Sequence, residues 1–132
     1  KWLYMPEGLK VGKFLYNLEN ALNTIDKYGL ESIILVEGIF DVWAYHKAGL
    51  DNVIAIFGSS LKEEQIKTLI GLGVDFILSF DNDEAGIKCT NKTIESLKLY
   101  GRIHVVELPE GKDPADLTSS ELLQCYMKRA RV

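Results

Sequence analysis

The sequence predicts an α/β fold with a four-stranded, mainly parallel sheet that is flanked by helices on both faces. Four short apolar runs, at residues 32–36, 53–57, 74–80 and 103–108, alternate with stretches of helical periodicity. Each run is apolar along nearly all of its length, which is typical of parallel strands covered on both sides. Right-handed crossovers bring the carboxyl ends of such strands to one edge of the sheet, where open α/β sheets bind ligands.

The first two helices are predicted from apolar spacing and from the glycines that end them. The first begins at Asn17 and stops at Gly29, and the second follows the first strand and closes at Gly49. The side chains that we expect to face the core from these two helices are Leu18, Leu22, Ile25, Ile39, Val42, Trp43 and Tyr45.

The later helices carry recognisable capping signals. Ser60 and Glu63 have the spacing of a capping box ahead of the third helix. The helix after the third strand runs to about residue 100, and its core face is expected to consist of Ile87, Ile94 and Leu97. The last helix is predicted to be capped by Thr118 and Glu121. The basic residues that follow it are expected to form only a solvated helix end, and these are Lys128, Arg129 and Arg131.

Length and composition predict one globular domain. The chain has 132 residues, of which 47% are apolar and 26% charged. We expect residues 1–30 to form an amino-terminal lead-in and helix continuous with the core, and residues 31–132 to form the main domain. Because the chain begins at Lys1, it is expected to be part of a longer protein. No apolar run approaches the roughly 20 residues that cross a bilayer, so we expect a cytoplasmic protein without a membrane partner.

The charge and the Cys and His content argue against some classes of function. A net charge of −4 disfavours broad, nonspecific binding to a nucleic-acid backbone, although it allows a local basic face. Cys89, Cys125, His46 and His104 stand apart in the sequence. We therefore predict neither a zinc site nor a Cys/His nucleophile, and we expect both cysteines to be reduced core residues.

Acidic residues follow three of the four predicted strands. Glu37 comes after the first, Asp81 and Asp83 after the third, and Asp113 after the fourth, while Asp41 lies one helical turn past Glu37. Like charges at one sheet edge repel unless one is protonated or a cation lies between them, and carboxylate oxygens suit a hard cation such as Mg²⁺. The alternative is that Asp83 caps the next helix and Asp81 belongs to a solvated loop. The number of carboxylates at one edge favours a metal site.

These acidic motifs resemble those of the Toprim domain, which bacterial primases, type IA and type II topoisomerases and certain nucleases share. The matching stretches are residues 35–38 (Leu-Val-Glu-Gly), followed by Asp41, and residues 80–86 (Phe-Asp-Asn-Asp-Glu-Ala-Gly). Within this group, the chain is most similar to the bacterial DnaG-type primases over nearly its whole length. The further stretches that resemble primase elements are residues 1–3, 6–7, 15–17, 57–60 and 108–114.

The resemblance implies a Toprim-like fold and a set of site residues. The implied catalytic residues are Glu37, Asp81 and Asp83, and the implied cofactor is Mg²⁺, with Mn²⁺ as a substitute and no zinc in this part of the protein. The implied metal ligands are Glu37, Asp41, Asp81, Asp83, Asp113 and Asp116. Of these, Asp116 departs from the primase pattern, because Ala115 stands where the primases have the second aspartate of an Asp-Pro-Asp element. The lysines matched to nucleotide or nucleic-acid contacts are Lys1, Lys10 and Lys13.

The implied activity is the Mg²⁺-dependent synthesis of short RNA primers from nucleoside triphosphates (NTPs) on single-stranded DNA, by a nucleotidyltransferase that is incomplete in this fragment. Glu37 either ligates the metal or acts as a general acid/base. The implied partners are the DNA template, NTPs, the RNA primer and, through regions outside this sequence, the replicative helicase, in a nucleoid-associated setting. The alternatives are a Toprim nuclease, a topoisomerase module, and a non-catalytic Toprim module that processes DNA. The intact Glu37, Asp81 and Asp83 argue against loss of catalysis.

Overall fold

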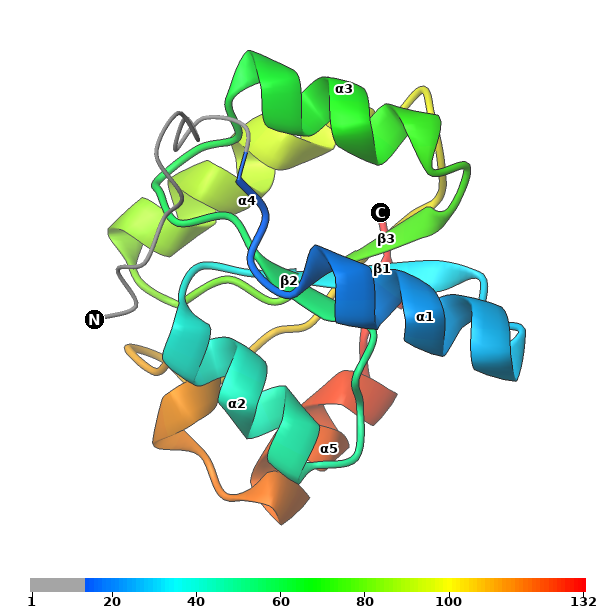
Figure 1. Ribbon diagram of the computed structural model, residues 1–132. Coiled ribbons are helices and arrows are strands. Elements are labelled where there is room, and N and C mark those ends of the chain that lie inside the picture. The colour runs from blue at the N-terminus through cyan, green and yellow to red at the C-terminus, as the bar shows by residue number, and fades with distance from the viewer. Residues whose placement is uncertain (1–13) are drawn as a thin grey trace.

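A five-stranded sheet forms the centre of the computed structural model, which describes residues 14–132 (Figure 1). Its strands are β1 (Ser32–Val36), β2 (Val53–Ala55), β3 (Asp75–Leu78), β4 (Ile103–Val105) and β5 (Ala130–Arg131). They lie in the order β2-β1-β3-β4-β5. The first four strands pair in parallel, and β5 is antiparallel to β4. The predicted four-stranded parallel sheet is confirmed, with one further strand at its edge.

The predicted solvated helix end of Lys128, Arg129 and Arg131 is only partly right. Lys128 is the exposed cap of α5, but Arg129 stacks over the ring of Tyr126 (4.3 Å) and Arg131 lies in the strand β5. Arg131 pairs with His104, and the N–H of Val132 donates to the carbonyl oxygen of Ile103 (2.9 Å). This pairing uses only main-chain groups, and both residues of β5 are exposed. No apolar pattern therefore marks β5 in the sequence.

Helices cover both faces of the sheet. The α-helices of residues 14–132 are α1 (Leu18–Tyr28), α2 (Ile39–Lys47), α3 (Glu63–Gly71), α4 (Glu84–Leu97) and α5 (Ser119–Met127). The first, third and fourth pack on one face, and α2 and α5 pack on the other. Figure 1 shows α3 and α4 above the sheet and α2 and α5 below it. In this part of the chain, no helix combines the length and the apolar content that a membrane span requires.

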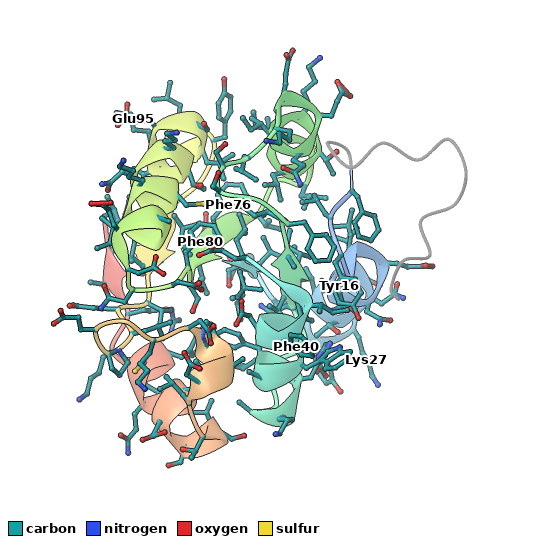
Figure 2. All side chains as sticks on the ribbon, turned by 90° about the vertical axis from the view of Figure 1, so that its left-hand side faces the viewer. Tyr16, Lys27, Phe40, Phe76, Phe80 and Glu95 are labelled. Atoms are coloured by element: carbon teal, nitrogen blue, oxygen red, sulfur yellow. The ribbon has the colours of Figure 1, made fainter. Side chains whose placement is uncertain are left out.

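The sheet separates two hydrophobic cores. The side chains of β1 alternate between them, since neighbouring residues of a strand point to opposite faces. Ile33 and Leu35 belong to the core beneath α1, α3 and α4, whereas Ile34 and Val36 belong to the core beneath α2 and α5. Figure 2 shows Phe76 of the first core in the interior beside α4. All five side chains are fully buried, so the central strands are fixed from both sides.

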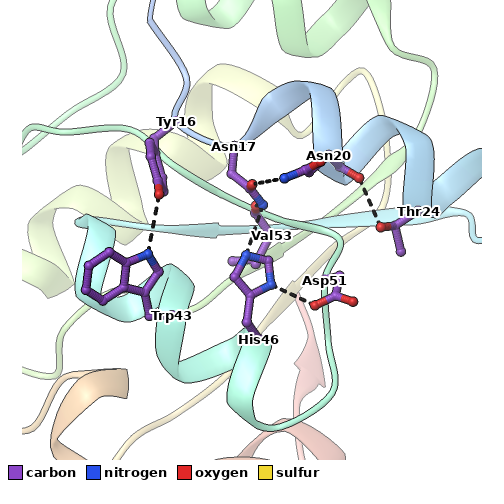
Figure 3. Close-up of polar contacts among 8 residues, drawn as sticks. All are labelled: Tyr16, Asn17, Asn20, Thr24, Trp43, His46, Asp51 and Val53. Atoms are coloured by element: carbon purple, nitrogen blue, oxygen red, sulfur yellow. Dashed lines mark hydrogen bonds and ion pairs between the residues drawn. The ribbon is translucent and has the colours of Figure 1, made fainter. Parts of the chain in front are cut away.

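Two side chains that we predicted to face the core are exposed instead. Trp43 is 46% exposed, its Nε1 donates to the hydroxyl of Tyr16 (3.3 Å; Figure 3), and its ring lies edge-on to that of Phe40. Ile87 is 50% exposed. Both residues lie off the buried faces of their helices, which consist of Asp41, Val42 and Tyr45 in α2 and of Gly86, Cys89, Thr93 and Leu97 in α4.

The predicted capping box of Ser60 and Glu63 is wrong. The cap of α3 is Lys62, whose backbone N–H donates to the side-chain oxygen of Gln65 (2.8 Å). The amide nitrogen of Gln65 donates in turn to the carbonyl oxygen of Ile56 (2.9 Å) and is buried there. This tertiary contact, which lies outside any local sequence pattern, sets where the helix starts.

Paired polar side chains close the sheet edge at which β2 begins (Figure 3). Asn17, in the left-handed conformation (φ 72°) ahead of α1, donates from Nδ2 to the carbonyl oxygen of Val53 (3.0 Å). The same nitrogen lies 3.4 Å from Nε2 of His46. On the other side of the ring, Nδ1 of His46 lies 2.7 Å from Oδ1 of Asp51. These contacts connect α1, α2 and β2.

Candidate metal centre

Acidic side chains gather at the carboxyl edge of the sheet, as the predicted topology requires. Glu37 directly follows β1, Asp81 lies three residues after β3, Asp113 lies in the loop after β4, and Asp41 lies in the first turn of α2. Because β1 and β3 pair directly, their ends emerge side by side. The backbone N–H of Asp81 donates to Oε2 of Glu37 (3.0 Å), which fixes the two turns relative to each other.

Three of these residues, Asp41, Asp81 and Asp113, form the centre of the site. Each offers one carboxylate oxygen, and these oxygens lie within 4.8 Å of one another. Asp41 is only 6% exposed and accepts two backbone hydrogen bonds, from the N–H of Gly38 to Oδ2 and from the N–H of Ala115 to Oδ1, both 3.2 Å. Asp41 thus holds the start of α2 against the loop that carries Asp113.

Burial and mutual repulsion raise the pKa values of all three carboxyls. Burial, followed by the charges of Glu37, Asp41 and Asp113, raises the pKa of Asp81 from 3.8 to about 8. Burial, followed by the charge of Asp113, raises the pKa of Asp41 from 3.8 to about 6. Burial and the neighbouring Asp116 raise the pKa of Asp113. Without a cation, the three carboxyls therefore resist full ionisation.

The residues present fit a hard divalent cation. The Oδ1 atom of Asp81 is buried and has no hydrogen-bond partner among residues 14–132. In the same part of the chain, no Lys, Arg or His side chain forms an ion pair with the three aspartates. Buried carboxylates are normally paired or bound to a metal. An all-oxygen set of donors suits Mg²⁺ or Mn²⁺ and is unlike the Cys and His sets that hold zinc.

Asp83 and Asp116, also predicted as ligands, lie outside the triad and form caps. Asp83 is exposed, and its Oδ1 accepts the N–H of Gly86 (2.8 Å) at the start of α4, as the alternative interpretation of the sequence expected. Its charge nevertheless contributes to the raised pKa of Asp81. Asp116 is exposed and exchanges two hydrogen bonds with Asp113, since each side chain accepts the other's backbone N–H (2.9 and 3.0 Å).

The two motif glycines differ in what they allow. A Cβ atom on Gly86 would lie 1.9 Å from the carbonyl oxygen of Asp81, so the first turn of α4 can pack on the end of β3 only without a side chain. A Cβ atom on Gly38 would meet nothing closer than Oδ2 of Asp41 at 3.8 Å, which is an ordinary contact. Close packing inside the protein therefore accounts for the glycine at position 86.

The structure also shows a contact residue that the sequence analysis missed. Asn82, between the two motif aspartates, donates from its side-chain Nδ2 to the carbonyl oxygen of Leu108. In the sequence, Asn82 stands out only as a neutral amide within an acidic motif. That feature does not predict a partner 26 residues away. The predicted nucleic-acid contacts Lys1, Lys10 and Lys13 lie outside the described residues.

Comparisons with known proteins identify the family of the chain. The model of a protein family described as Toprim-like matches residues 34–118. A DNA primase of Staphylococcus aureus (strain MSSA476) is 40% identical over 117 residues, which are 86% of this chain and 19% of the primase. The crystal structure of the Aquifex aeolicus primase (zinc-binding and RNA polymerase domains) superimposes with a TM-score of 0.81 and 28% identity, over 96% of this chain and 32% of that one.

A DNA primase domain from Pseudomonas aeruginosa superimposes with a TM-score of 0.80 and 30% identity, over 96% of this chain and 41% of that domain. The chain spans about a fifth of the length of the curated DNA primases that it matches. The matched residues of the family contain the last three residues of β1, all of β2 to β4 and every predicted acidic site residue, from Glu37 to Asp116. The chain therefore belongs to the Toprim-like family.

Proposed function

We propose that this chain is the catalytic Toprim core of a DNA primase, which synthesises short RNA primers from NTPs on single-stranded DNA with Mg²⁺ as cofactor. The observation that carries the proposal is the triad of Asp41, Asp81 and Asp113 at the carboxyl edge of the sheet. The 40% identity to a DNA primase favours this activity over the other reactions associated with the Toprim fold.

In this proposal, the triad holds the metal and the surrounding residues keep the triad in place. Bound Mg²⁺ supplies positive charge that stabilises the attacking and leaving oxygens of a nucleotidyl transfer. Asp41, Asp81 and Asp113 provide the nearest oxygens. Glu37 positions Asp81 through the backbone N–H that it accepts, and it is also placed to act as a ligand or as a general acid/base.

Asp83 and Asp116 have a supporting part in the proposal. Each uses one carboxylate oxygen in a cap, and each adds negative charge next to a triad member. Mg²⁺ usually keeps several of its waters, so these two residues would act on the cation through water. We assign catalysis to Glu37, Asp81 and Asp83, and in this assignment Asp83 acts on the cation through water.

The partners of the proposed reaction are single-stranded DNA, NTPs and the growing RNA primer. Lys1, Lys10 and Lys13 would contact nucleotide or nucleic acid, and the replicative helicase would bind parts of the protein outside this chain. A location in the cytoplasm, at the nucleoid, follows from that role.

Titration calorimetry with Mg²⁺, repeated with Mn²⁺, tests the metal site. Asp81→Asn replaces a carboxyl that can ionise on metal binding by an amide of nearly the same shape, and we expect it to weaken binding at least tenfold. Asp26→Asn is the matched control, because Asp26 is an exposed aspartate of α1. Absence of binding by the unmodified chain, or equal binding by Asp81→Asn, would contradict the proposed site.

A second assay separates primer synthesis from the other Toprim reactions. The full-length protein is incubated with single-stranded DNA, NTPs and Mg²⁺, and the products are separated by size. We expect RNA primers from the unmodified protein and from Asp26→Asn, and none from Asp81→Asn. Metal-dependent cleavage of the DNA without RNA synthesis would instead identify a Toprim nuclease.

A further inference from the structure

Asn82 binds the loop that delivers Asp113. Its backbone N–H donates to the carbonyl oxygen of Lys112 (2.9 Å), and its own carbonyl accepts the N–H of Gly111 (2.7 Å). Its side-chain Nδ2 donates to the carbonyl oxygen of Leu108 (2.5 Å). One residue thus makes three hydrogen bonds along residues 108–112.

These bonds connect the nearest neighbours of two triad members. Asn82 directly follows Asp81, and Lys112 directly precedes Asp113. Beyond Asp113, the N–H of Ala115 donates to Oδ1 of Asp41 (3.2 Å). The loop is therefore held on both sides of Asp113, and each attachment is made by a triad member or by its neighbour.

Most of this loop lies at the surface. Leu108 is buried, but Pro109, Glu110, Gly111 and Lys112 are all exposed. Asp81 and Asp113 carry like charges, which push the loop away from β3 whenever both are ionised. Hydrogen bonds from Asn82 oppose that separation without adding charge, which an acidic or basic residue at this position could not do.

We propose that Asn82 is a positioning residue whose side-chain amide fixes Asp113 beside Asp81 before metal binds, so that the cation enters a preformed site. This inference rests on the proposed function, because it assumes that the triad binds a divalent cation. Any residue other than proline can make the two backbone bonds of Asn82, because they need only a backbone N–H and a backbone carbonyl. The bond to Leu108 depends on the amide side chain, and it is the bond that a substitution can remove selectively.

Asn82→Ala tests the inference, with Asn17→Gly as the matched control. Asn17 also donates from its amide to a backbone carbonyl, that of Val53 (3.0 Å), but it does so at the opposite edge of the sheet. Glycine suits the left-handed backbone at position 17 (φ 72°). Both variants therefore lose an amide-to-carbonyl hydrogen bond of the same kind, and only Asn82→Ala loses it next to the triad. Asn17→Gly also removes the contacts of Asn17 with His46 and Asn20, so it is the more demanding control for general stability. Asn82→Ser, whose side chain is too short to make the bond in the same place, serves as a second variant if Asn82→Ala does not fold.

The measurements are the dissociation constant for Mg²⁺ and Mn²⁺ by calorimetry, and amide hydrogen exchange of Gly111 and Ala115 without metal. We expect Asn82→Ala to raise the dissociation constant about tenfold, the low end of the range for outer contacts of metal ligands, and to accelerate exchange of both amides. We expect Asn17→Gly to stay within twofold of the unmodified chain in both measurements.

Equal metal affinity of Asn82→Ala and the unmodified chain would overturn the inference while leaving the proposed function in place. Equal weakening by Asn82→Ala and Asn17→Gly would also overturn it, because the effect would then follow general stability. Absence of metal binding by the unmodified chain would overturn both the inference and the proposed function.

Discussion

The two edges of the sheet both carry polar side chains, but they satisfy them in opposite ways. Where β2 and β1 begin, three polar side chains have neutral or oppositely charged partners: Asn17 binds the backbone at Val53, Asn52 binds the backbone at Ser32 (2.9 Å), and His46 pairs with Asp51. Where the strands end, carboxylates face one another. One edge is complete without a ligand, while the other holds repulsion that a cation would relieve.

This difference shows how one fold separates stability from binding. Polar groups that already have partners hold the helices and strands together, and a ligand that contacts them would add little binding free energy. The charges at the carboxyl edge oppose folding when no ligand is present, and the same charges give a cation its binding free energy. The region that costs the protein stability is thus the region that binds.

The largest effect should come from filling the close contact beneath the carboxyl edge. Gly86→Ala places a Cβ atom 1.9 Å from the Asp81 carbonyl oxygen, so α4 or the end of β3 must move. We expect a loss of about 3 kcal/mol in the free energy of unfolding, measured by urea denaturation, together with weaker metal binding.

Gly71→Ala is the control for this substitution. A Cβ atom at Gly71, the last residue of α3, would meet no atom within 4 Å. It should be neutral or slightly stabilising, because alanine favours the helix over glycine. A loss of similar size at both positions would contradict the contact at Gly86.

An intermediate effect should follow from titrating the carboxyl edge. The folded pKa of Asp81 is about 8, against an ordinary value of 3.8, so the folded protein binds this proton more tightly than the unfolded chain does. Stability without metal should therefore fall as the pH rises from about 4 to 8. Asp81→Asn should remove part of this slope and raise the melting temperature at pH 8 by about 3 °C.

Melting curves across this pH range, with and without Mg²⁺, test the prediction. Mg²⁺ should raise the melting temperature of the unmodified chain and have little effect on Asp81→Asn. If the unmodified chain melted at the same temperature from pH 5 to 8, or if Asp81→Asn melted lower at pH 8, the carboxyl edge would not carry unrelieved charge.

The smallest effect is expected at the opposite edge. The pair of His46 and Asp51 has side chains that are 32% and 53% exposed, and such surface pairs contribute little. Asp51→Asn should cost about 0.5 kcal/mol in the free energy of unfolding and leave the affinity for Mg²⁺ unchanged. A change in metal affinity would show that the two edges are coupled and that the pair of His46 and Asp51 does not act on stability alone.

The sequence predicted what depends on local pattern and strand order. Long apolar runs identified β1 to β4, and the predicted capping box of Thr118 and Glu121 is confirmed, with hydrogen bonds of 2.9 and 3.1 Å. Because the carboxyl ends of parallel strands lie at one edge of the sheet, the sequence also predicted that Asp41, Asp81 and Asp113 lie near one another.

What the sequence could not predict depends on contacts between distant residues. The strand β5 has no apolar pattern, and the start of α3 depends on the buried side chain of Gln65. Spacing alone does not distinguish a metal ligand from a helix cap, so the sequence left both roles open for Asp83. The hydrogen bond from Asn82 to Leu108 joins two loops, and the apolar periodicity of the sequence does not indicate it.

The separation of the two cores by the sheet has a consequence for how this protein can change over generations. Leu97 and Leu122 are fully buried on opposite sides, in clusters with no member in common. Substitutions at such independent positions are expected to be additive in their effects on stability. Each core can therefore accumulate replacements without compensation from the other, provided that the strands between them keep their register and continue to deliver the aspartates to the same place.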